Sequence, residues 1–211
     1  MREDFTDIRI VLDRSGSMQS ICETVIRSVN EFVIEQRKGP GDCVVSLYQF
    51  DDVFETVYSE CPIRDAPMLN AEIYKPRNST ALLDAIGRTI TLTGIRLANM
   101  YAADRPANVV LVIVTDGKEN ASVEFTQAQI FSMIKLQRDV YSWKFVFLAA
   151  NQDAIEAGKT MGISEKHSMT YAHSARGMSV SAAAAGDLVR AFRAGNSNAA
   201  FSNTQRQDAN P

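Results

Sequence analysis

The sequence predicts an α/β fold: an open, doubly wound and mostly parallel sheet with helices on both faces. Aliphatic segments alternate with amphipathic ones along most of the chain, at intervals that suit βαβ units. The aliphatic run at 109–115 (VVLVIVT) is typical of a strand buried on both faces at the centre of such a sheet. Only Asp51 and Asp52 separate the predicted strands 44–50 and 53–58, so we expect a hairpin with one antiparallel edge strand.

The other elements follow in regular order. Residues 7–12 form a first β-branched strand that ends at Asp13. Apolar side chains spaced by three and four predict a helix from Met18 to Val33, and Gly39 and Pro40 end it. After the hairpin we expect a loop over 62–77, a helix over 80–100, the central strand, a helix opened by a capping box at 125–129, a strand over 144–150, a helix over 153–161, a weak strand over 168–172 and an Ala-rich helix over 180–193.

The length and composition fit one domain with a short tail. The chain has 211 residues, of which 45% are hydrophobic and 22% charged, and this balance can form a sizeable buried core. We expect the domain to span residues 1–195. Residues 196–211 are polar and nearly free of aliphatic side chains, which predicts a disordered tail.

Charge and hydropathy exclude two classes of partner. The net charge is −3, the pI is near 5.5, and no run rich in Lys and Arg is present, which argues against nucleic-acid binding. The N-terminus is acidic where a signal peptide would be basic, and no stretch approaches the roughly 18 apolar residues of a membrane span. We therefore expect no membrane partner and a cytoplasmic location.

Polar side chains gather where the functional loops of a doubly wound sheet lie, beyond the carboxyl ends of the strands. Asp13, Ser15 and Ser17 follow the first strand as a D-x-S-x-S loop. Alternate residues in a tight loop point to the same side, and Gly16 relaxes the backbone between them. These three side chains are therefore expected to converge on one point.

Two further segments reach the same edge. Asp116 follows the central strand, and Asn78, Ser79 and Thr80 begin the helix that precedes that strand. The resulting set of carboxylate and hydroxyl oxygens suits a hard cation, with Mg²⁺ expected and Mn²⁺ or Ca²⁺ as alternatives. The serines could merely cap the first helix, but capping does not explain why Asp13 and Asp116 end two separate strands.

The motifs DRSGS at 13–17, Thr80 before a helix and TDG at 115–117 resemble the von Willebrand factor type A family, in its compact intracellular bacterial and phage-type form. The resemblance implies a Rossmann-like sheet whose third strand is antiparallel. It also implies a metal-ion-dependent adhesion site in which a partner's Glu or Asp completes the coordination, with these protein residues around the ion: Asp13, Ser15, Ser17, Thr80 and Asp116.

One departure concerns the segment before Thr80. Many relatives have glycines there, whereas this chain has Asn78 and Ser79. No ligand is lost, but the sequence leaves open which of these side chains faces the ion.

Four charged residues are candidates for the rim that a partner would contact. Asp51 and Asp52 lie on the predicted hairpin, and Lys118 and Glu119 follow Asp116. A solvated turn and an ordinary loop leading to a helix are the alternative interpretations of these two pairs.

The predicted function is a divalent-metal-dependent protein-binding module, an adaptor or assembly component, and not an enzyme. A structural role in a larger assembly such as a phage particle is one alternative, and a metal-dependent phosphohydrolase is another, although no general base is evident. Gly158-Lys159-Thr160 lacks the first glycine of a phosphate-binding loop. His167 and His173 are assigned surface or structural roles. The partner and the oligomeric state stay open.

Overall fold

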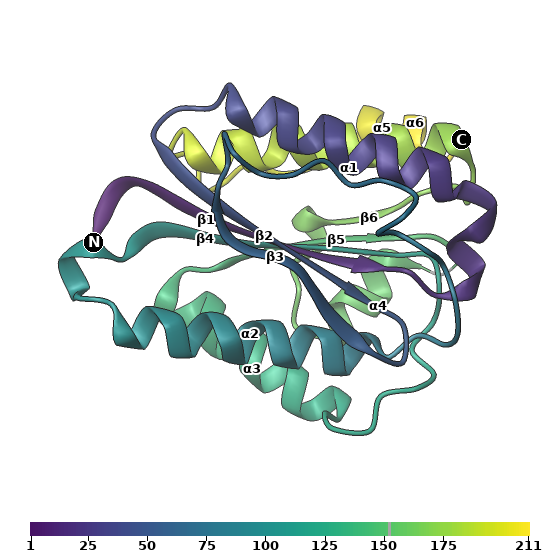
Figure 1. Cartoon of the computed structure of the whole chain (residues 1–211), viewed down its shortest axis with the longest axis horizontal. Coiled ribbons are helices and arrows are strands. Elements are labelled where there is room, and N and C mark those ends of the chain that lie inside the picture. Colours follow the sequence, from purple (N-terminus) through teal and green to yellow (C-terminus); the bar gives the residue numbers. More distant parts are fainter. Residues whose placement is uncertain (152) are drawn as a thin grey trace.

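The computed structural model describes residues 1–151 and 153–211, and over these the chain forms one six-stranded sheet between two layers of helices (Figure 1). The strand order is β3-β2-β1-β4-β5-β6. Only the β2–β3 pair is antiparallel among these strands, as the short hairpin predicts. The strands are β1 (Arg2–Asp13), β2 (Asp42–Phe50), β3 (Phe54–Pro62), β4 (Pro106–Thr115), β5 (Lys144–Ala149) and β6 (Ser168–Thr170).

The helices cover both faces of the sheet (Figure 1). On one face lie α1 (Cys22–Arg37), α5 (Ala175–Arg193) and α6 (Asn203–Ala209), and on the other α2 (Leu82–Asn99), α3 (Gln127–Tyr141) and α4 (Ala154–Thr160). Short 3-10 helices are η1 (Gly16–Ile21), η2 (Ala102–Asp104) and η3 (Glu165–His167). The predicted doubly wound fold is confirmed. Within the described ranges, no helix is both long and apolar enough to cross a lipid bilayer.

The aliphatic strand β4 lies at the centre because both of its faces meet apolar side chains. Val110, Val112 and Val114 belong to the core beneath α1 and α5. Leu111 and Ile113 belong to the core beneath α2 and α3. This two-sided burial explains why the strand is an unbroken apolar run and does not alternate with polar residues.

Two helix boundaries differ from the prediction. The first helix is preceded by η1, so its α-helical part begins only at Cys22. The last long helix begins at Ala175 and not near residue 180, because the side chain of Ser174 caps it by accepting from the amide of Gly177. The capping box predicted at Thr126 and Gln129 is present at the start of α3.

Residues 196–211 differ from the disordered tail that the sequence predicts. They contain α6, which Ser202 caps through a capping box. Phe201 and Ala209 are buried against the layer of α1 and α5. The guanidinium of Arg206 donates to backbone carbonyls beside β6. Two buried apolar side chains and these capping interactions thus tie a polar stretch to the folded domain.

The strand order reverses between β1 and β4, which are neighbours in the sheet although distant in sequence. Leu12 of β1 pairs with Val114 of β4, and Asp13 pairs with Phe50 of β2. The carboxyl ends of these strands therefore meet at one edge, where ligand sites form in folds of this kind.

Candidate metal centre

Asp13 connects the ends of β1 and β4. Its side chain is fully buried, with Oδ1 accepting from the amide of Ser15 at 2.6 Å and Oδ2 from the hydroxyl of Thr115 at 2.5 Å. Both carboxylate oxygens are therefore engaged by protein donors. Asp13 orients the loop that leaves β1 and places its negative charge directly behind that loop.

The hydroxyls of the D-x-S-x-S loop form a short chain of contacts that ends at Asp116. Ser15 Oγ lies 3.1 Å from Ser17 Oγ, and Ser17 Oγ donates to Asp116 Oδ1 at 2.5 Å. The sequence separates Ser17 from Asp116 widely, and the adjacency of β1 and β4 brings them together. The side-chain oxygens of Ser15, Ser17 and Asp116 therefore lie side by side.

Thr80 is the third hydroxyl at this edge. A β-carbon placed on Gly117 would lie 3.0 Å from Thr80 Oγ1 and 3.7 Å from Ser17 Oγ, so both hydroxyls face the same glycine. Thr80 is buried, and its amide donates to the side chain of Asn120 at 2.9 Å. The loop that follows Asp116 thus fixes the position of Thr80.

The residues before Thr80 face elsewhere. Asn78 has a φ of 57°, and its side-chain amide donates to Asp52 at 2.9 Å. The backbone carbonyl of Asn78 accepts from the amide of Gly16 at 3.1 Å, which joins this segment to the D-x-S-x-S loop. Ser79 is exposed. Of the candidates that the sequence leaves open, Thr80 is the one buried beside Ser17.

Asp116 carries the observation most specific to a cation. Its side chain is fully buried, and Oδ2 has no hydrogen-bond partner among the described residues. A carboxylate oxygen that is buried without a hydrogen bond is costly, because it has lost water and gained no well-aligned donor. A dication next to this oxygen would balance the negative charge of the carboxylate. The residues present therefore fit a metal ion.

His173 also belongs to this centre, and the sequence interpretation missed it. Its Nε2 lies 2.7 Å from Asp116 Oδ2, and the imidazole is mostly buried. His173 follows β6 at the carboxyl edge of the sheet, in the short segment that leads to α5. Its position just after a predicted strand would indicate a place at the functional edge of the sheet. That strand is only weakly predicted, so the sequence does not single out His173.

Burial has a clear electrostatic effect on Asp13. Loss of solvent raises the pKa of this carboxyl from 3.8 to about 6, although hydrogen bonds from Thr115 and Ser15 act in the opposite direction. The nearby charge of Asp116 raises the pKa of Asp13 further. The ionised pair is therefore unfavourable by itself, and a bound dication would compensate for it.

Asp51, a predicted rim residue, is fully buried. Its Oδ2 lies 2.6 Å from Nε of Arg77 and 3.3 Å from Nε of Arg14, and its backbone carbonyl accepts from the amide of Ala81. This ion pair joins the β2–β3 hairpin to the segment that carries Thr80. The side chain of Asp51 thus supports the site from within, whereas the adjacent Asp52 is exposed.

Glu119, another predicted rim residue, also has a structural place. Its carboxylate accepts from the amide of Leu83 at 2.9 Å, in the first turn of α2, and from the amide and hydroxyl of Ser122. Asp84 completes this junction by accepting from the amides of residues 123–125. Lys118 is exposed. Of the four candidates, Asp52 and Lys118 are therefore the two that are exposed.

The donor set depends on hydroxyl oxygens. Across residues 1–151 and 153–211, no group of three or more His, Cys, Asp and Glu side chains suited to a metal ion is present.

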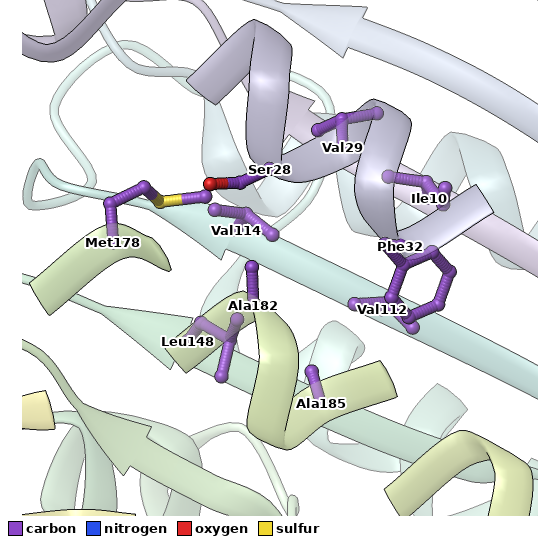
Figure 2. A pocket seen from close by; sticks show the side chains of 10 residues that line it. All are labelled: Ile10, Ser28, Val29, Phe32, Val112, Val114, Leu148, Met178, Ala182 and Ala185. Carbon is purple, nitrogen blue, oxygen red and sulfur yellow. The ribbon is translucent and has the colours of Figure 1, made fainter. Parts of the chain in front are cut away.

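A cavity of about 20 Å³ between α1 and α5 is large enough for about one water molecule. Figure 2 shows that apolar side chains and Ser28 surround it, with no charged group. That cavity offers nothing to a cation.

Comparisons with known proteins bear on the family and the fold of this chain. The profile of the von Willebrand factor type A domain matches residues 7–177. Proximal thread matrix protein 1 from the mussel byssus, solved with a zinc-occupied MIDAS motif, is 16% identical with a TM-score of 0.60, over 88% of this chain and 46% of that one. A von Willebrand factor type A protein from Catenulispora acidiphila is 10% identical with a TM-score of 0.54, over 92% and 43%.

These two structures show the fold alone, because their sequence identity is low. This chain spans less than half the length of each of them. The sequence has no significant match among curated proteins.

Proposed function

This chain belongs to the von Willebrand factor type A domain family, and on that premise we propose that it is a divalent-metal-dependent protein-binding module. In this proposal a carboxylate of a protein partner completes the coordination of an ion at the carboxyl edge of the sheet. The observation that carries it is the buried Oδ2 of Asp116, which accepts no hydrogen bond among the described residues and lies next to hydroxyls from two other segments.

The donor set explains why such an ion would bind a carboxylate of a partner. Ser15, Ser17 and Thr80 would offer neutral hydroxyl oxygens, and Asp116 would offer one carboxylate. The charge of Asp13 lies behind the loop, where both of its oxygens already accept hydrogen bonds. An ion held mainly by neutral oxygens keeps much of its positive charge, and Mg²⁺ sites of this kind retain open positions for external oxygens.

The surroundings favour an acidic partner. The exposed Lys118 lies two residues after Asp116 and offers a cation beside the entrance to the site. Charge complementarity at a rim of this kind steers association and sets specificity. Asp52 is exposed on the β2–β3 hairpin, and its negative charge would repel a carboxylate, so we propose that the partner's carboxylate approaches over the Lys118 side.

The zinc-occupied motif of the mussel protein supports a dication at the corresponding place. The role of that longer protein does not transfer to this chain. Within our proposal the chain is a cytoplasmic adaptor or assembly component without a catalytic step. The alternative is a metal-dependent phosphohydrolase, for which the imidazole of His173 would be the candidate general base. Turnover of a phosphoester in the presence of Mg²⁺ or Mn²⁺ would contradict a role in binding alone.

The test is metal-dependent capture by the purified chain, in Mg²⁺, in Mn²⁺ and in EDTA. We compare the natural chain with Asp116→Asn, and use Asp52→Asn as a matched control at the same sheet edge. A partner retained by the natural chain and by Asp52→Asn, and lost in EDTA and with Asp116→Asn, supports the proposal. Capture that persists in EDTA or with a folded Asp116→Asn variant overturns it.

A further inference from the structure

The contact between His173 and Asp116 lacks the geometry of a hydrogen bond. The two atoms, Nε2 and Oδ2, lie 2.7 Å apart, yet within the described part of the chain neither has a hydrogen-bond partner. Two lone-pair atoms repel each other at such a distance unless a proton or a cation lies between them. The alignment is not that of a hydrogen bond, and a cation bound to both atoms would relieve the repulsion.

The spacing of the donor atoms agrees with a shared cation. Neighbouring ligand atoms of an octahedral dication, each about 2.1 Å from the ion, lie about 3 Å from one another. The separation of His173 Nε2 from Asp116 Oδ2 is 2.7 Å, and that of the Ser15 and Ser17 hydroxyls is 3.1 Å. Both pairs have the spacing of adjacent ligands.

The backbone holds His173 in this position. On one side, the buried Tyr171 donates its hydroxyl to the carbonyl of Thr115 at 3.1 Å, directly before Asp116. The amide of Ala172 donates to Ala209 at the end of α6 at 2.8 Å. On the other side, Ser174 caps α5. The imidazole is therefore presented by a segment that is anchored at both ends.

We propose that His173 is a ligand of the metal centre, and that its Nε2 binds the ion beside Asp116. The inference rests on the proposed function, since it needs an ion at this centre. An imidazole nitrogen suits late first-row dications such as Co²⁺ and Zn²⁺, whereas Mg²⁺ and Ca²⁺ prefer oxygen. The centre accordingly selects a late first-row dication, which differs from the all-oxygen set expected from the sequence.

This assignment leaves room for a partner. Three hydroxyls, Asp116 and His173 provide five donors, and an octahedral ion has six positions. The sixth stays available for a carboxylate of the partner. His173 therefore changes the identity of the ion without closing the site.

The direct test looks for nitrogen in the coordination shell. Pulsed electron paramagnetic resonance of Mn²⁺ bound to the purified chain detects a coupled ¹⁴N nucleus if His173 is a ligand. We expect this coupling in the natural chain and in His167→Ala, which removes the other histidine of the sequence. We expect its loss in His173→Ala and in the more conservative His173→Gln. The measurement on the natural chain needs no variant, so it holds even if a variant fails to fold.

The second readout is selectivity. Calorimetric titration with Co²⁺ and with Mg²⁺ should show that His173→Gln weakens Co²⁺ binding by about tenfold or more, the scale on which ligand surroundings act. We expect Mg²⁺ affinity to change by less than about threefold, because oxygen donors dominate its binding.

Two results would overturn the inference while sparing the proposed function. One is ion binding that Asp116→Asn abolishes but that shows no nitrogen coupling in the natural chain. The other is an equal loss of Co²⁺ and Mg²⁺ affinity in His173→Gln, which would make His173 a positioning residue that only holds Asp116. If the natural chain binds no dication, both proposals fail.

Discussion

Gly117 packs against the hydroxyl of Thr80: a β-carbon at residue 117 would lie only 3.0 Å from Thr80 Oγ1. The same β-carbon would lie 3.7 Å from Ser17 Oγ. The absence of a side chain after Asp116 thus lets hydroxyls from two segments approach one point. The substitution Gly117→Ala, which adds a single methyl group, tests this relationship.

We expect Gly117→Ala to weaken Mn²⁺ binding by roughly tenfold, or about 1.4 kcal/mol, because Thr80 must move by a few tenths of an ångström. Calorimetric titration measures the effect. Gly94→Ala is the matched control: a β-carbon there meets no atom within 4 Å, and alanine stabilises a helix interior by about 0.5–1 kcal/mol. Unchanged Mn²⁺ affinity in Gly117→Ala would show that Thr80 is not a ligand.

The buried ion pair of Asp51 with Arg77 and Arg14 gives a prediction about stability. Asp51→Asn should lower the free energy of unfolding by about 3 kcal/mol, because it leaves the buried guanidinium of Arg14 short of one negative partner. Urea denaturation in EDTA measures the loss. The same substitution at the exposed Asp52 should change stability by less than about 0.5 kcal/mol. Equal losses of stability at the two positions would contradict the structural role of Asp51 and favour a role at the rim.

The raised pKa of Asp13 predicts a pH dependence with a definite sign. Its pKa is about 6 in the folded, metal-free chain against 3.8 in the reference state, so the folded state binds more protons between these values. The contribution of Asp13 to stability is therefore present at low pH and lost as pH rises through about 6.

The measurement is the difference in unfolding free energy between the natural chain and Asp13→Asn in EDTA, followed across this range. We expect the natural chain to lose stability relative to the variant as pH rises. Mn²⁺ affinity should increase over the same range, because the ion favours the ionised carboxyl. A difference that is flat, or that moves the other way, contradicts the assignment.

The cap of α6 predicts a smaller effect. Ser202→Ala should cost about 1 kcal/mol, since it removes the side-chain acceptor for the amide of Gln205. Ser197→Ala changes an exposed serine outside any helix and serves as the control. Thermal unfolding compares the two variants. Identical midpoints would mean that α6 adds nothing to the folded state.

The fold was predictable because its signals are local. Aliphatic runs and helical spacing mark the elements, and the two-residue hairpin at Asp51 and Asp52 marks the antiparallel edge. The alignment of Asp13 with Asp116 then follows from the rule that functional loops lie at the carboxyl edge of a parallel sheet. The structure places Ser17 against Asp116 and Ser15, and Thr80 faces the adjacent Gly117, whereas both carboxylate oxygens of Asp13 accept hydrogen bonds from Ser15 and Thr115.

The remaining features depend on contacts between distant segments. Nothing near Asp51 in the sequence shows that Arg14 and Arg77 contact it, so the sequence alone predicts a place at the rim for this short acidic turn. His173 follows a strand of only three residues, Ser168–Thr170, which a periodic pattern scarcely marks. The tail has few apolar residues, and burial of Phe201 is visible only after the chain folds back.

The central claim is that an ion binds where Asp116 meets the hydroxyls of Ser15, Ser17 and Thr80. Equilibrium binding of Mn²⁺ to the purified natural chain and to Asp116→Asn, with Asp52→Asn as control, tests it most directly. We expect one ion per chain for the natural protein and the control, and none for Asp116→Asn. A natural chain that binds no ion, or a folded Asp116→Asn variant that binds it equally well, would contradict this claim.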